Sequence, residues 1–257
     1  MEYKNILLDY SDAIACITIN RPKQLNALNS ATIAELNTAI TTINNDESIR
    51  CIIITGAEKK AFVAGADIKE FAAFSKKEGE ALARKGQEIL FDLLENSNKP
   101  TIAAINGFAL GGGLELAMAC HMRLASDNAK MGLPEVSLGV IPGYGGTQRL
   151  ANLVGKGKAL EMITTAAMIS AEEAKSWGLV NHITTIEELM PLAEKIASKM
   201  LRNSPMAISK AIKAVNANYK EGIDGFEVEK EEFGNCFATD EFVEGTTAFL
   251  EKRKAKF

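Results

Sequence analysis

Short apolar runs alternate with stretches of helical spacing along the first 140 residues. Residues 6–9 and 13–20 are two β-type runs separated by a polar turn, which predicts a hairpin. Asn29 or Ser30 can cap the helix that follows, because apolar residues then recur every three or four positions. The chain therefore opens with strands and a helix that pack one face against a core.

Two apolar runs further along predict strands buried on both faces. Residues 51–55 are mostly β-branched and end at a glycine, and residues 101–105 follow a Lys-Pro pair. A polar, charge-dotted helix is predicted between them over residues 76–95. A short helix from Gly112, a strand over residues 122–125 and a turn over residues 130–132 are predicted next. This alternation is typical of an α/β fold.

The pattern becomes mostly helical from about residue 145. Helices are predicted at 145–153, 155–165, 171–177, 185–202, 205–219, 223–235 and 239–254, and only residues 179–184 read as a strand. The chain is thus predicted to have an α/β core over residues 1–195 and a helical C-terminal region over residues 196–257. No Pro/Ser-rich linker separates them, so we expect the two parts to pack as one unit.

Composition and charge exclude several classes of function. The 257 residues are 47% hydrophobic and 24% charged, as in ordinary globular proteins, so a sizeable core is expected. The net charge of −4 argues against nucleic acid or a membrane surface as a partner. The basic run at residues 252–256 is interpreted as a solvated chain end.

The four cysteines lie far apart, mostly among apolar neighbours, and are interpreted as buried, reduced thiols. The sequence begins directly with folded-looking sequence, and no apolar run is long enough to cross a membrane. A cytoplasmic protein is therefore expected.

Several familiar kinds of site are missing from the sequence. There is no G-x-S-x-G elbow, no phosphate-binding G-x-x-x-x-G-K-[ST] motif and no metal-ligand spacing. Both glycine clusters fail G-x-G-x-x-G at its last position. Cys120 and His121 are adjacent on a predicted helix and would point about 100° apart, so they cannot face one target. His121 and His182 are interpreted as structural, and neither a metal nor a nucleotide cofactor is expected.

The candidate chemistry lies in three loops. Residues 61–69 are rich in small residues, which lets a backbone approach a ligand or simply make a tight turn. Residues 106–115 run from a buried strand through three glycines into a helix. Free N–H groups and the positive end of a helix dipole then meet at one place, where they can stabilise charge on a carbonyl oxygen. Glu115 heads this apolar helix, so it either complements the dipole or has a function.

The third loop, residues 132–147, contains Glu135. Pro134 favours an extended approach, so Glu135 is predicted to project from a loop rather than from a helix. Alone it would read as a surface glutamate. The three loops together favour an enzyme that stabilises negative charge on a carbonyl oxygen of its substrate with backbone N–H groups and acts on the substrate with Glu115 and Glu135.

These loops resemble the crotonase superfamily, and specifically the enoyl-CoA hydratases, over essentially the whole chain. The resemblance is carried by INRP at 19–22, LNAL at 25–28, AGADIK at 64–69, the glycine loop at 106–115, PGYGGTQRL at 142–150 and AFLEKRK at 248–254.

The resemblance implies a spiral of ββα units followed by a helical oligomerisation region, in homohexamers built from two trimers. It implies oxyanion donors at the N–H groups of Ala66 and Gly112, with Glu115 and Glu135 as the catalytic carboxylates. Ala66, Asp67, Ile68, Lys69 and Gly112 would bind the substrate. The implied reaction is reversible addition of water to a trans-2-enoyl-CoA such as crotonyl-CoA, with coenzyme A entering only as part of the substrate.

Several alternatives stay open at this point, among them another acyl-CoA enzyme of the crotonase type. Isomerases of the superfamily often keep only the second carboxylate, so two glutamates favour hydration without excluding double-bond migration. Some crotonase relatives bind RNA, which the acidic net charge argues against. A non-catalytic relative would retain a buried carboxylate without using it, which is unfavourable.

Overall fold

Two β-sheets form the body of the protein in the computed structural model, which describes residues 3–257. The strands of the first sheet are Ile6–Ser11 (β1), Ile14–Ile19 (β2), Cys51–Gly56 (β3), Thr101–Ile105 (β5), Met122–Ser126 (β7) and His182–Thr184 (β10). Those of the second are Ala61–Ala64 (β4), Phe108–Leu110 (β6), Lys130–Gly132 (β8) and Met168–Ser170 (β9). The strand orders are β1-β2-β3-β5-β7-β10 and β4-β6-β8-β9.

The chain winds between the two sheets as a spiral. Each turn adds one strand to the first sheet and then one to the second: β3 is followed by β4, β5 by β6, and β7 by β8. Successive turns pair in parallel, as β3 does with β5 and β4 with β6. The α/β fold predicted as a spiral of ββα units is therefore confirmed.

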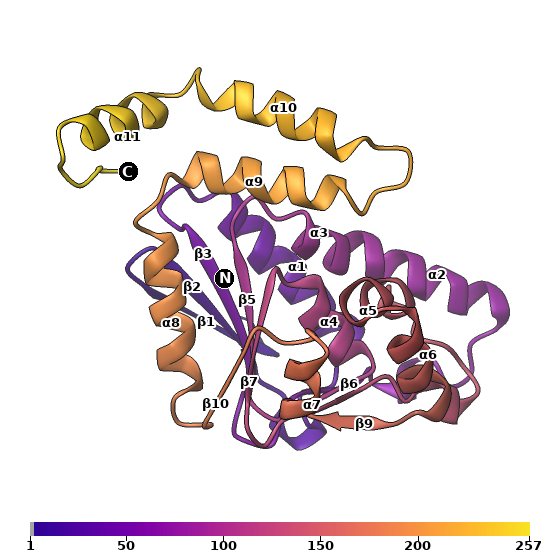
Figure 1. The fold of residues 1–257 in the computed structure, drawn as a ribbon. Helices are drawn as coiled ribbons and strands as arrows, with labels where there is room; N and C mark the ends of the chain where they lie inside the picture. The colour runs from indigo at the N-terminus through magenta and orange to yellow at the C-terminus, as the bar shows by residue number, and fades with distance from the viewer. Residues whose placement is uncertain (1–2) are drawn as a thin grey trace.

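The helices cover the spiral and then extend beyond it (Figure 1). Those of the body are Ser30–Asn45 (α1), Lys76–Gly86 (α2), Asp92–Glu95 (α3), Gly112–Ala119 (α4), Gly146–Val154 (α5), Lys156–Thr165 (α6), Ala171–Ser176 (α7) and Leu189–Met200 (α8). Between α2 and α3 the helix continues through a π-helical turn, Gln87–Phe91 (η3). Short 3₁₀ turns lie at Pro22–Gln24 (η1), Ile68–Glu70 (η2) and Glu135–Leu138 (η4).

The core lies on both faces of the first sheet, as β3 illustrates. All six of its residues are buried. Ile52 and Ile54 point into the main core between the sheets and α1, whereas Cys51 and Ile53 pack against α8. A strand with both faces covered has few polar positions, which is why its sequence is mostly apolar. Its one polar side chain, Thr55, donates to the carbonyl of Ala104 at 2.9 Å.

The last three helices lie at one side of the body: Pro205–Ala217 (α9), Gly225–Cys236 (α10) and Asp240–Leu250 (α11). In Figure 1, α9 borders the body, and α10 and α11 lie on the far side of α9 from the body. Glu232 of α10 is buried and pairs with Lys210, at 2.9 Å, and with Lys213 of α9. The proposed boundary between residues 195 and 196 stays a prediction, and α8 runs through it.

Several sequence predictions were wrong in detail. Residues 130–132 form β8 rather than a turn, and the predicted strand at 179–184 is reduced to β10. The sequence interpretation also missed β4, β6 and β9. Each of these strands has only three or four residues and forms through pairing with a distant turn of the spiral. A local hydrophobic pattern cannot register such pairing.

Candidate active site

A cavity of about 270 Å³ opens where the second sheet, the start of α4 and the π-containing helix meet. Its walls include backbone and side chains from all three candidate loops and from α2. Ala66, Gly112, Glu115 and Glu135 all line this cavity. A larger cavity of about 540 Å³ lies under α9, and no second glutamate joins Glu95 among its lining residues. Of these two cavities, only the smaller has carboxylates from two of the candidate loops in its wall.

The glycines at the start of α4 bring the helix end against the second sheet. Gly111 has φ 51° and ψ −126°, and its N–H donates to the carbonyl of Gly132 at 2.9 Å. A Cβ on Gly113 would overlap the backbone oxygen of Val63 in β4. Only glycine fits at positions 111 and 113, and the two set the N-terminus of a fully buried helix at the cavity wall.

Two backbone N–H groups are free at this wall. Within residues 3–257, the N–H groups of Ala66 and Gly112 have no protein acceptor. The two residues are close, because the nitrogen of Ala66 lies 3.7 Å from where a Cβ on Gly112 would stand. Hydrogen bonds from Leu28 to Gly65 at 2.9 Å and from Asp67 to Leu28 at 2.7 Å fix the backbone around Ala66. The pair can hydrogen-bond a ligand oxygen that carries negative charge.

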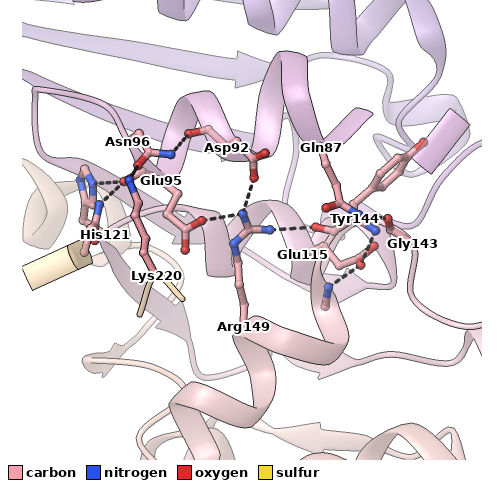
Figure 2. Close-up of polar contacts among 12 residues, drawn as sticks. Gln87, Asp92, Glu95, Asn96, Glu115, His121, Gly143, Tyr144, Arg149 and Lys220 are labelled. Carbon is pink, nitrogen blue, oxygen red and sulfur yellow. Dashed lines mark hydrogen bonds and ion pairs between the residues drawn. The ribbon is translucent and has the colours of Figure 1, made fainter. Parts of the chain in front are cut away.

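Glu115 lies in the first turn of α4 and is 1% exposed. Its Oε1 accepts hydrogen bonds from the N–H groups of Tyr144 and Gly146, both at 2.8 Å (Figure 2). Burial, and then the charge of Glu135, raise the pKa of Glu115 to about 7, against the opposing effect of these two donors and of Arg149. A carboxyl group with a pKa near neutrality can take up or release a proton at physiological pH.

Glu135 faces the same cavity from the other loop. It is half-buried, and burial raises its pKa above the ordinary glutamate value. Its Oε2 is buried without a hydrogen-bond partner in the described chain, which is unusual for a polar atom in a folded protein. The expected extended approach was wrong: Pro134 has φ −85° and ψ 10°, and Glu135 begins the 3₁₀ turn η4.

The remaining substrate-binding candidates occupy different positions. Ile68 lines the cavity and is 45% exposed. The carboxylate of Asp67 pairs with Arg21 at 3.2 Å, and Lys69 is exposed on η2. Asp67 and Lys69 do not line the cavity, whose residues surround the space beside the two glutamates.

The turn of residues 143–146, whose N–H groups hydrogen-bond to Glu115, is itself held by contacts from outside the cavity. The sequence did not reveal these contacts. Gln87 donates to the carbonyl of Gly143 at 2.7 Å, and Arg149 donates to that of Tyr144 at 2.9 Å (Figure 2). The ring of Tyr144 stacks on Phe91, with centroids 4.7 Å apart. The sequence places Arg149 in a predicted helix but does not indicate which residues its side chain contacts.

The histidine and cysteine predictions need partial correction. Cys120 and His121 follow the end of α4 at Ala119, so the argument from their spacing on a helix was wrong. Both ring nitrogens of His121 are engaged by Thr101 and by the carbonyl of Glu95, which suits a structural residue. All four cysteines are free, but only Cys51 and Cys120 are buried. The described part of the chain has no group of three metal-ligating side chains, and none of its helices has the length and apolarity to cross a membrane.

Comparison with known proteins gives a consistent result. A crotonyl-CoA hydratase from Syntrophomonas wolfei is 48% identical over 100% of this chain and 99% of its own. A short-chain-enoyl-CoA hydratase from Clostridium acetobutylicum is 48% identical over 99% of this chain and 97% of its own. The crystal structure of an enoyl-CoA hydratase from Bacillus anthracis superposes with a TM-score of 0.91 at 39% identity, covering 99% of both chains. The profile of the enoyl-CoA hydratase/isomerase family matches residues 9–257. The chain therefore belongs to the enoyl-CoA hydratase/isomerase family, whose fold it shares.

Proposed function

We propose that this protein catalyses the reversible addition of water to a short trans-2-enoyl-CoA, giving the 3-hydroxyacyl-CoA. The observation that carries the proposal is one cavity with two free backbone donors and two glutamates whose pKa values are raised. The names of the relatives from Syntrophomonas wolfei and Clostridium acetobutylicum support a short substrate.

In the proposed reaction the thioester carbonyl accepts hydrogen bonds from the N–H groups of Ala66 and Gly112. These bonds stabilise the enolate charge that develops on its oxygen, an effect of roughly 3–4 kcal/mol per donor in a comparable site. A water molecule between the carboxyl groups adds to Cβ. Glu115 acts as base toward the water, and Glu135 protonates Cα. Because the carboxyl groups share one water, their titrations are coupled.

No separate cofactor takes part in this proposal, since coenzyme A enters and leaves as part of the substrate. Polar groups suited to proton transfer are sufficient for hydration, which involves no net oxidation or reduction. A cytoplasmic location stays a prediction.

Hydration of crotonyl-CoA is the direct test. Purified protein mixed with crotonyl-CoA should remove the absorbance of the conjugated enoyl thioester, because addition of water breaks the conjugation. The product should be 3-hydroxybutyryl-CoA, identified by mass spectrometry. Migration of the double bond in a 3-enoyl-CoA, without hydration of crotonyl-CoA, would instead assign an isomerase. RNA binding without turnover of either substrate would contradict both activities.

We also propose that the helices beyond residue 196 assemble the chain into a homohexamer of two trimers. Large apolar side chains are exposed along α10 and α11, including Phe226 at 75%, Phe233 at 67% and Phe249 at 83%. Exposed apolar surface of this extent marks an interaction site. The family resemblance supports a second copy of the chain as its partner.

Light scattering coupled to size exclusion should give six times the chain mass of 27.7 kDa. Replacing both Phe226 and Phe233 by Glu should produce smaller species, because charge is unfavourable in an apolar interface. Tyr10→Glu alters an exposed aromatic residue on β1 and should leave the mass unchanged. A monomeric wild-type protein would contradict the proposal.

A further inference from the structure

The turn of residues 143–146 connects the cavity to a group of charged residues outside it. On the cavity side, its N–H groups hold Glu115. On the outer side, Arg149 donates through Nη1 to the carbonyl of Tyr144 and through Nη2 to Asp92 at 3.0 Å and Glu95 at 2.7 Å. Figure 2 shows Arg149 between the carboxylates of α3 and this turn.

The guanidinium of Arg149 packs directly against the turn, which is possible because residue 145 is glycine. Gly145 has φ 88°, and a Cβ there would overlap the guanidinium of Arg149. The peptide group between Gly143 and Tyr144 accepts from Gln87 through its carbonyl and donates to Glu115 through its N–H. Hydrogen bonds in such a chain polarise one another. Gln87 therefore polarises the peptide whose N–H binds Glu115, whereas Arg149 fixes the position of the turn through the carbonyl of Tyr144.

We propose that Arg149, assisted by Gln87, is a positioning residue. It holds the turn whose N–H groups, at Tyr144 and Gly146, bind Glu115, and thereby keeps this carboxylate aligned for hydration. The inference rests on the proposed function, because it assigns Glu115 a role in turnover. Arg149 touches neither the cavity's ligand space nor Glu115 through a hydrogen bond, so it acts through the turn.

A purely stabilising role fits the details of Arg149 less well. Its side chain is 10% exposed and its Nε is buried without a partner in the described residues. Burying a charge with one unsatisfied donor is unfavourable, so such ion pairs are weak contributors to stability. The orientation of the guanidinium is instead the one that lets a single group reach the turn and both carboxylates.

The charged and titratable groups around Glu115 and Arg149 make the role of Arg149 measurable through the pH dependence of the rate. Glu135, Tyr144 and Arg149 influence or face Glu115, while Asp92 and Glu95 face Arg149. Burial lowers the pKa of Arg149, but Glu95 and Asp92 outweigh this and leave it raised, so the residue stays charged. Its positive charge lowers the pKa of Glu115. Since a base acts when deprotonated, loss of Arg149 should move the rising limb of the pH–rate profile to higher pH.

The test compares Arg149→Met with Arg149→Lys and with a matched control, Lys158→Met. Lys158 is a buried cation on α6 that pairs with Glu161 and Glu173, at 3.0 and 2.6 Å, outside the cavity. Arg149→Met should lower kcat about 10- to 100-fold, as expected for a misplaced reacting group, with a small change in KM. Arg149→Lys should recover the wild-type pH profile and part of kcat. Lys158→Met should change thermal stability without moving the profile.

A second readout is independent of turnover. The pKa of Glu115 in the free protein can be measured by carbon NMR of labelled glutamate carboxyl groups, with Glu115→Gln to assign the signal. Arg149→Met should raise this pKa relative to wild type. If Arg149→Met fails to fold, the pair Asp92→Asn and Glu95→Gln removes the anchors of Arg149 and should also lower kcat. An unchanged Glu115 titration, or a loss of kcat equal to that in Lys158→Met, would overturn the inference. A failure of wild-type hydration with a shifted titration would contradict only the proposed function.

Discussion

Replacing Glu115 or Glu135 by Gln should each lower kcat for crotonyl-CoA hydration by roughly 10²–10⁴-fold, the usual contribution of a general acid or base. Both substitutions keep the side-chain shape and remove the ability to exchange a proton. The free N–H groups of Ala66 and Gly112 stay in place, so binding of acyl-CoA should change only slightly. Stopped-flow absorbance for turnover and calorimetry with a saturated acyl-CoA for binding would measure the two effects separately.

Glu187→Gln is the appropriate control for this pair. Glu187 is exposed and pairs with Lys59 at 2.8 Å, away from the cavity. It should retain wild-type kcat. Full activity in either Glu115→Gln or Glu135→Gln would exclude the two-carboxylate mechanism, whereas loss of binding as well as turnover would point to a structural defect.

The same Glu115→Gln substitution should stabilise the protein at alkaline pH. The pKa of Glu115 is about 7 in the folded chain, compared with the ordinary value of 4.5. The folded state therefore binds the proton more tightly than the unfolded state, and this carboxyl group reduces stability progressively as pH rises from 4.5 to 7. The penalty reaches its full value once the pH is well above 7, and a shift of this size corresponds to about 3 kcal/mol.

Glutamine carries no charge to desolvate, and its amide oxygen can still accept from Tyr144 and Gly146. The free energy of unfolding of Glu115→Gln, measured by denaturant titration, should exceed that of wild type at pH 8.5. The difference should shrink toward pH 4.5, where the wild-type carboxyl group is also protonated. A gain that is independent of pH, or a loss at pH 8.5, would show that the buried charge is not the cause.

Much of the fold could be predicted because its longer elements have a local signature. The hairpin of β1 and β2, the buried strands β3 and β5, and the helix that begins after Asn29 all follow from hydrophobic spacing and capping. Asn29 indeed accepts from the N–H of Thr32 at 2.8 Å. The strands of the second sheet did not follow, because their pairing partners are a full turn of the spiral away.

The candidate site was predictable to the extent that its chemistry is local. Three glycines before a buried helix indicate free N–H groups, and a glutamate at its head indicates a buried carboxylate. The support for Glu115 could not be predicted, because Gln87, Asp92 and Glu95 meet Arg149 and its turn only after α3 and α5 have packed. Asp67 was predicted to bind substrate from its place in the AGADIK motif. Its carboxylate instead pairs with Arg21, and nothing in the local sequence indicated this contact.

The π-helical turn Gln87–Phe91 joins two halves of one continuous helix that contact different parts of the site. Before the turn, Leu82 and Ala83 line the cavity; after it, Asp92 and Glu95 anchor Arg149. A π turn accommodates an extra residue, so deleting one would rotate one half by about 100° relative to the other. Substitutions at Leu82 and Ala83 would reshape the cavity wall and leave the anchors of Arg149 in place, whereas Gly86 packs against Tyr144 and so also supports the turn. The residues of this helix that line the cavity thus differ from those that hold the turn around Glu115.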